Sequence, residues 1–133
     1  RTEGYQSTAD ALQSHDDLAA VFAINDPSAL GAYTAIEEAN RQNQIKIIGF
    51  DEDPRTLKAI DAGEIHGTVV QKPYEFGYQA VVALRAMVVG GQTPKDLEVP
   101  DTNQKFIETL TIRKGEGLNY LKKCDAWKQS ISK

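Results

Sequence analysis

The sequence predicts an α/β protein built on a doubly wound parallel sheet, with helices on both sides of the sheet in three layers, α/β/α. Three apolar, β-branched runs carry this prediction, at Ala20 to Ile24, Ile45 to Asp51 and Gly67 to Val70, and each leads into an amphipathic stretch that begins at a proline. Strands that alternate with helices in this way are typical of βαβ units with right-handed crossovers. The chain has 133 residues, about one domain, and its hydrophobic fraction of 41% is ordinary for a globular protein.

Composition and charge exclude several classes of function. The formal net charge of −4 argues against non-specific binding to nucleic acid. Cys124 is the one cysteine, so neither an intrachain disulfide nor a cysteine-based metal site can form. His15 and His66 lie far apart in the chain. We therefore expect no metal ion and no cofactor.

The ends of the chain carry little information about its compartment. No apolar run approaches the length of a membrane-spanning helix. Residues 1–4 do not resemble the start of a signal peptide, and the first residue is not methionine. We expect a chain that has been processed or that is part of a longer one.

The first part of the chain is predicted to run helix, strand, helix. Apolar residues recur at helical spacing over 2–14. The run 20–24 is apolar throughout, which predicts a strand buried on both faces. Asp26 is the expected N-cap of a helix over 27–42, because its carboxylate could accept from the amides of the first turn and Pro27 suits the first helical position.

The same pattern repeats after the strand that ends at Asp51. Asp53 is the expected N-cap and Pro54 the first residue of a second helix. Gly63 is expected to end this helix, since glycine readily adopts the left-handed conformation found at helix C-termini.

The last part of the chain is predicted from weaker patterns. A third helix is expected over 73–89, after the strand that ends at Val70. The polar stretch 92–103 contains two prolines and predicts a loop. Residues 106–112 are expected to form a strand and residues 118–124 a short helix.

Polar side chains stand at the ends of the three predicted strands: Asn25, Asp51 and Gln71. Each taken alone is more often a turn or capping residue than a ligand contact. Together they would meet at one edge of a parallel sheet, where open α/β sheets bind ligands. Their mixture of donors and acceptors suits sugar hydroxyls, and Phe50 could pack on the apolar face of a sugar ring.

No catalytic constellation is found, and no residue is assigned a catalytic role. Asp51, Glu52 and Asp53 could suggest paired carboxylates or a magnesium site in a small α/β enzyme. Successive side chains point apart, however, and Asp53 is expected to cap a helix. A binding protein is therefore favoured over an enzyme.

Several segments carry a family resemblance: Val21 to Pro27 with Ala29 to Ala32, Ile48 to Asp51, Leu57 to Ile60 with Gly63 to Ile65, and Thr68 to Pro73 with Gly77 to Val81. Their order and spacing resemble the C-terminal half of ribose-type periplasmic sugar-binding proteins, the solute receptors of ABC importers. The resemblance implies a fold like that of type I periplasmic binding proteins, of which this chain would be the second-lobe portion.

The resemblance also implies a function and a site. Hydrogen bonds to the sugar would fall to Asn25, Asp51 and Gln71, and Phe50 would help to line the pocket. The protein would close two lobes on a monosaccharide, a pentose or a hexose, and present the closed form to the membrane permease of an ABC importer. A precursor with a signal peptide is implied, and a location in the periplasm or on a lipid anchor outside the cytoplasm.

The chain would contribute to both lobes of such a receptor. Residues 1–71 are expected in the C-terminal, sugar-binding lobe, and residues 72–102 to pack with an N-terminal lobe that this chain lacks. Residues 103–133 would form the strand that returns through the hinge and a C-terminal tail.

The main alternative is the effector-binding domain of lac-repressor-type transcription regulators. These resemble the chain at the Asn25-Asp26 and Gly49-Phe50-Asp51 motifs. They usually carry a Pro-x-Leu-Thr-Thr type segment before the last of these strands, where this chain has Ala59 to Ile65. The transport receptor is therefore favoured.

Overall fold

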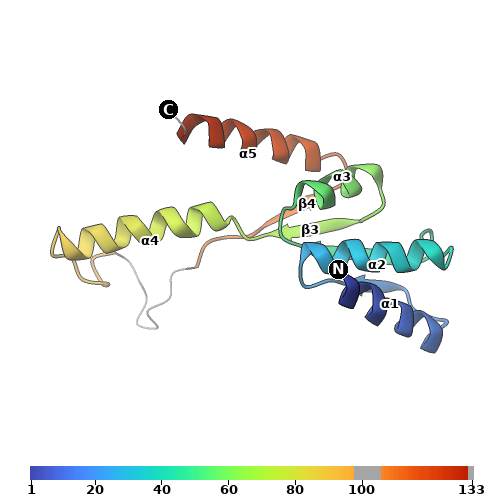
Figure 1. Ribbon diagram of the computed structural model, residues 1–133. Coiled ribbons are helices and arrows are strands. Elements are labelled where there is room, and N and C mark those ends of the chain that lie inside the picture. The colour runs from blue at the N-terminus through green and yellow to red at the C-terminus, as the bar shows by residue number, and fades with distance from the viewer. Residues whose placement is uncertain (98–105, 132–133) are drawn as a thin grey trace. The chain divides into compact units, whose positions relative to one another are not determined.

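The computed structural model describes residues 1–97 and 106–131, and the chain divides into two compact units (Figure 1). The first unit comprises residues 1–70 and 111–133, and the second residues 71–110. The second unit holds α4 (Pro73–Val88). The first holds, in chain order, α1 (Thr2–Ser14), β1 (Ala20–Phe22), α2 (Asp26–Glu38), β2 (Lys46–Phe50), α3 (Pro54–Ala62), β3 (Gly67–Val70), most of β4 (Leu110–Arg113) and α5 (Gly117–Ile131).

The first three strands form the parallel sheet that the sequence predicts. β2 lies between β1 and β3, and β4 completes a sheet of order β1-β2-β3-β4. Val21 is paired in register with Ile47, and Ile48 with Gly67. Gly67 also lies against β4, where the Cβ of any other residue would lie 2.9 Å from the carbonyl oxygen of Ile112. A glycine is therefore needed for the close approach of β4.

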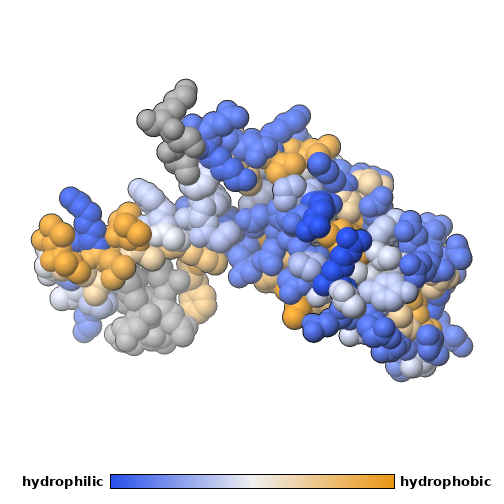
Figure 2. Space-filling model, viewed as in Figure 1, coloured by the Kyte–Doolittle hydropathy of each residue, from blue (hydrophilic) through white to orange (hydrophobic). Residues whose placement is uncertain are grey.

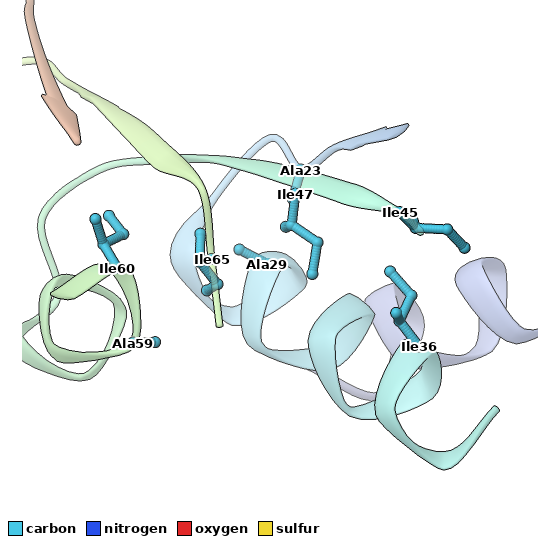
Figure 3. Close-up of a cluster of buried hydrophobic side chains, with 8 residues drawn as sticks. All are labelled: Ala23, Ala29, Ile36, Ile45, Ile47, Ala59, Ile60 and Ile65. Carbon is cyan, nitrogen blue, oxygen red and sulfur yellow. The ribbon is translucent and has the colours of Figure 1, made fainter. Parts of the chain in front are cut away.

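One face of the sheet packs against α2 and α3. The buried side chains of this core are drawn in Figure 3: Ala23, Ala29, Ile36, Ile45, Ile47, Ala59, Ile60 and Ile65. Because side chains alternate along a strand, the residues next to these core residues in each strand point to the opposite face of the sheet. Phe22 and Ile24 are accordingly 61% and 73% exposed. This corrects the expectation that the run 20–24 is buried on both faces.

The N-terminus of α2 also differs from the prediction. Asn25, not Asp26, is the N-cap, and its side-chain oxygen accepts a hydrogen bond from the Ser28 amide at 3.0 Å. Both residue types cap helices well, and the extended backbone of Asn25 places its side chain over the first turn. For α3 the predicted cap Asp53 and the left-handed Gly63, with φ of 88°, are confirmed.

Other boundaries shift as well. α2 ends at Glu38, earlier than predicted, because Asn40 takes up a left-handed conformation with φ of 56°. β4 begins and ends later than the predicted strand 106–112. α5 is longer than the predicted helix 118–124, since no glycine or proline follows its first residue. The predicted loop 92–103 lies partly outside the described residues.

α4 is rich in apolar residues, most of which are exposed. None of its 16 residues is buried. The exposed apolar side chains are Tyr74, Phe76, Tyr78, Val81, Val82, Leu84, Met87 and Val88, and some of this surface is seen in orange at the left of Figure 2. Apolar surface of this extent usually marks a contact with another part of a protein. In the described ranges, no helix is long and apolar enough to cross a membrane.

Asp61 of α3 holds the N-terminus of α5. Its Oδ1 accepts from the amides of Gly115 at 2.8 Å and Gly117 at 3.1 Å, and its Oδ2 from the amide of Leu118 at 2.7 Å. These bonds, that from Leu118 foremost, hold the pKa of Asp61 below its usual value. A carboxylate on one helix thus satisfies the free amides of another.

His66 extends the pairing of β2 with β3. Its amide donates to the carbonyl oxygen of Ile47 at 2.8 Å, and its ring Nδ1 accepts from the Ile47 amide at 3.2 Å. Nδ1 can accept only while the imidazole is neutral. Burial, and to a smaller extent the charge of Lys46, lowers the pKa of His66 from its ordinary value of 6.5.

Replacing Asp61 by asparagine should lower the free energy of unfolding of the full-length protein by about 0.3–1 kcal/mol, the range for a charge lost at a helix N-terminus. The amide offers one acceptor oxygen in place of two and no charge at the helix N-terminus. Asp125→Asn is the matched control, because Asp125 lies on α5 and makes an exposed ion pair of 3.8 Å with Lys128. Urea denaturation measures both, and equal losses would contradict the capping role.

The stability of the protein should fall as the pH is lowered through the titration of His66. Its folded-state pKa is depressed, so its contribution is complete above about pH 6.5 and is lost as the pH falls through the lowered pKa. Unfolding free energies measured between about pH 8 and pH 5 test this. His66→Gln should lose part of the slope and His15→Gln, at an exposed position, should keep it. An unchanged slope in His66→Gln would contradict the account.

Candidate functional site

Asn25, Phe50 and Asp51 lie at the carboxyl edge of the sheet. β1 and β2 are parallel neighbours. Their pairing continues beyond β1, where the Ala23 amide donates to the carbonyl oxygen of Ile48 at 2.8 Å. The residues that follow these two strands are thereby brought to the same edge, where parallel sheets bind ligands.

Gln71, the fourth predicted site residue, belongs to the second unit. It follows the last residue of β3 and is half-buried. Lys72 comes next, with a left-handed backbone at φ of 56°, and Pro73 begins α4. The ligand role predicted for Gln71 stays a prediction.

Asn25 has a structural duty in addition to its predicted role. Its Oδ1 is engaged by the Ser28 amide in the cap of α2. The group that Asn25 can offer to a ligand is therefore its NH2, which donates hydrogen bonds. At this position the two roles are compatible, because they use different atoms of one side chain.

Asp51 is held by its backbone against β3. Its amide donates to the carbonyl oxygen of Val69 at 2.9 Å, and its carbonyl oxygen accepts from the hydroxyl of Thr68 at 2.8 Å. Thr68 is fully buried. The backbone of Asp51 has a φ of 82°, a region that Asp and Asn visit more readily than most residues. The bonds from β3 and from the Thr68 hydroxyl together fix the backbone position of Asp51.

Phe50 forms an aromatic pair with Phe22. Their ring centroids are 6.3 Å apart, and the planes meet at 79°, an edge-to-face contact. The pair lies on the exposed face of the sheet, next to the strand ends. Sequence reasoning missed Phe22, because the run in which it lies is apolar throughout. The register of β1 with β2, which sets Phe22 opposite Ile48, is what places it beside Phe50.

Asp26 is a buried acid that joins the two segments of the site. Its Oδ2 accepts from the Asp53 amide at 2.7 Å. Burial raises the pKa of Asp26, and the charges of Asp53 and Asp51 raise it further. The buried Thr56 hydroxyl favours the charged form of Asp26 and so lowers its pKa. In the described ranges, however, neither this hydroxyl nor Oδ1 of Asp26 makes a hydrogen bond of good geometry.

The edge is acidic, and the pKa values of Glu52 and Asp53 are shifted in opposite directions. Burial first, then the charges of Asp51 and Asp26, raise the pKa of Glu52. The guanidinium of Arg55 lowers the pKa of Asp53, to which it donates at 3.0 Å. In the part of the chain that the structure describes, no group of three or more His, Cys, Asp or Glu is arranged to hold a metal ion.

A surface hollow of about 270 Å³ lies beside β1 and does not include Asn25, Phe50 or Asp51. It is lined by residues of α1, of β1 and the loop that follows it, and of α2: Glu3, Gly4, Ser7, Thr8, Val21, Phe22, Ala23, Ile24, Ser28 and Ala32. The strand ends themselves form an open edge, which is suited to one side of a binding site.

Fold and site together define a class of protein. A parallel α/β sheet with hydrogen-bonding side chains at the carboxyl ends of neighbouring strands is the architecture of a ligand-binding domain. Residues 1–92 match the model of the periplasmic binding protein domain, and the chain belongs to this family.

Relatives of known name and structure agree. The chain is 37% identical over 103 residues to the ribose import binding protein of Haemophilus influenzae, covering 74% of this chain and 35% of that protein. GanP, a glucose-galactose binding protein from Geobacillus stearothermophilus, is 33% identical with a TM-score of 0.71, covering 84% of this chain and 37% of that one. The periplasmic ribose ABC transporter structure from Conexibacter woesei is 27% identical with a TM-score of 0.76, covering 90% and 38%.

These matches confirm the resemblance and the fold that it implied, that of type I periplasmic binding proteins. They also set its extent: the chain spans about a third of the length of these relatives.

Replacing Asn25 by alanine should lower the free energy of unfolding by about 1 kcal/mol, because the Ser28 amide loses its acceptor. Asn25→Ser is the matched variant, since a serine hydroxyl caps nearly as well, and its stability should stay within a few tenths of a kcal/mol of the wild type. Urea denaturation of the full-length protein compares them. Equal stability of the two variants would contradict the cap.

Proposed function

We propose that this chain is part of a solute receptor that binds a monosaccharide between two lobes and delivers it to an ABC-type sugar importer. The observation that carries the proposal is the placement of Asn25 and Asp51 at one sheet edge in a chain of this family. Relatives named for ribose and for glucose and galactose support a monosaccharide ligand.

Each proposed ligand residue offers a different chemistry. The carboxylate of Asp51 accepts from sugar hydroxyls, and the NH2 of Asn25 donates to a hydroxyl oxygen. Gln71 can do both. Phe50, supported by Phe22, offers an apolar surface for a ring face. The sugar would be held by these contacts without covalent chemistry.

The lobe assignment is part of the proposal. Residues 1–71 belong to the sugar-binding lobe, residues 72–102 pack with the N-terminal lobe, and residues 103–133 return through the hinge and form the tail. The exposed apolar length of α4 supports a partner outside this chain, and a second compact unit begins at Gln71. The boundary between 102 and 103 lies outside the described residues.

The proposal includes a compartment and a second partner. Relatives named as import binding proteins support a receptor in the periplasm, or one held on a lipid anchor outside the cytoplasm, that presents its closed form to a membrane permease. Closure of two lobes around a ligand is a common hinge motion and gives the permease a shape to recognise.

Two alternatives have less support. An effector-binding domain of a lac-repressor-type regulator would share the fold, and a small α/β enzyme would use the acids at the strand ends. Relatives named as a ribose import binding protein and as a glucose-galactose binding protein favour the receptor.

The full-length protein should bind at least one of D-ribose, D-allose, D-glucose and D-galactose in a calorimetric titration. Asp51→Asn should weaken this binding by roughly 10- to 100-fold, because a hydrogen bond to a charged group is lost. Asparagine tolerates a positive φ, so the backbone is not strained by the change.

Asn25→Ser should also weaken sugar binding while leaving stability nearly unchanged, because the cap remains and the NH2 donor is gone. Asp125→Asn on α5 is the control and should bind like the wild type. Failure of the wild type to bind any of the four sugars would contradict the proposed function. Unchanged affinity in both site variants would contradict the site alone.

A further inference from the structure

Asp26 joins two segments that carry the proposed ligand residues. It is only 6% exposed, and its Oδ2 accepts from the Asp53 amide at 2.7 Å. Asp26 directly follows Asn25, the N-cap of α2, and is the first residue of that helix, whereas Asp53 lies in the loop after β2. A buried hydrogen bond therefore ties the start of α2 to the loop after β2 across the edge of the sheet.

The turn that this bond reaches is one that needs support. Asp51 has a φ of 82°, a conformation that a residue other than glycine keeps only when its surroundings hold it. On the side of β3, Thr68 and Val69 fix the backbone of Asp51 itself. Asp26 fixes the far end of the same turn at Asp53.

Stability alone does not account for a carboxylate at this place. Its burial disfavours the charged form, and the nearby Thr56 hydroxyl offsets only part of this cost, since it makes no hydrogen bond of good geometry to Oδ1 in the described part of the chain. Asp51 and Asp53, both acidic, lie close enough to disfavour its charge further. What this carboxylate does provide is an acceptor for the Asp53 amide, which is the interaction that reaches the turn carrying Asp51.

We propose that Asp26 is a positioning residue, whose hydrogen bond to the Asp53 amide fixes the turn 51–53 so that the Asp51 side chain is presented to the ligand. This rests on the proposed function, since it takes Asp51 as a ligand contact. Asp26 itself need not touch the sugar.

The direct test compares variants of the full-length protein. Asp26→Ala removes the acceptor and should weaken binding of the sugar that the wild type prefers, D-ribose being tried first, by about tenfold or more. Asp26→Asn keeps an oxygen for the Asp53 amide and should stay within about threefold of the wild type. Asp26→Ser, too short to reach the amide, replaces the alanine variant if that does not fold.

Asp61→Asn is the matched control for lost stability, because it loosens α5 and not the site. It should bind the sugar with wild-type affinity at a temperature where both variants are folded. If Asp26→Ala melts earlier but binds like the wild type, Asp26 is merely structural and the proposal is overturned.

A double-mutant cycle shows whether Asp26 acts through Asp51. In an Asp51→Asn background, Asp26→Ala should weaken binding by much less than in the wild type, because the group that it positions is already altered. Equal weakening in both backgrounds would overturn the proposal.

One measurement needs no sugar and so separates this inference from the proposed function. Hydrogen exchange at the Asp53 amide should speed up in Asp26→Ala and stay slow in Asp26→Asn and Asp61→Asn. Unchanged exchange in Asp26→Ala would overturn the positioning role. A wild type that binds no sugar but shows the expected exchange would contradict the proposed function and not the bond that fixes the turn.

Discussion

The parallel pairing of β1 with β2 is the constraint on which the rest of the first unit depends. Parallel neighbours require a crossover, and α2 supplies it, burying Ala29 and Ile36 against the side chains of β2. The same pairing decides where the chain emerges from each strand. Asn25 and Asp51 come from loops that are distant in sequence, and they share an edge because the two strands run in one direction. The pairing of β1 with β2 therefore determines both the core and the position of the candidate site.

The site itself is built more from backbone constraints than from contacts between its side chains. Asn25 caps α2 with one atom of its amide, Thr68 holds the carbonyl of Asp51, and Asp26 ties down the turn that follows. The first two of these bonds have a local structural reason, and the third is the one that we assign to the site. If Asn25 and Asp51 bind a ligand as proposed, these bonds hold their backbone in place beforehand, which would reduce the entropy cost of binding. β1 and α4 expose apolar surfaces, which is consistent with a chain that spans about a third of the length of its relatives.

Much of this fold could be predicted from the sequence, because its signals are local. Neighbouring residues alone indicate strands β2 and β3, the cap at Asp53 and the glycine that ends α3. The same holds for the polar residues at the strand ends. Sequence could not choose between Asn25 and Asp26 as the cap, since both suit the position. Nor could it foresee the exposed face of β1, because burial depends on what covers a sheet. The bond from Asp26 to Asp53 and the tie from Asp61 to α5 join residues that only the folded chain brings together.

The central claim is that the carboxyl edge of β1 and β2 forms one wall of a sugar site. A crystal structure of the full-length protein with its bound sugar tests it most directly. We expect the Asp51 carboxylate and the Asn25 amide nitrogen within hydrogen-bonding distance, about 2.6–3.2 Å, of sugar hydroxyls. The Asn25 oxygen should stay on the Ser28 amide. A sugar bound elsewhere, or one that leaves both side chains out of reach, would contradict the account.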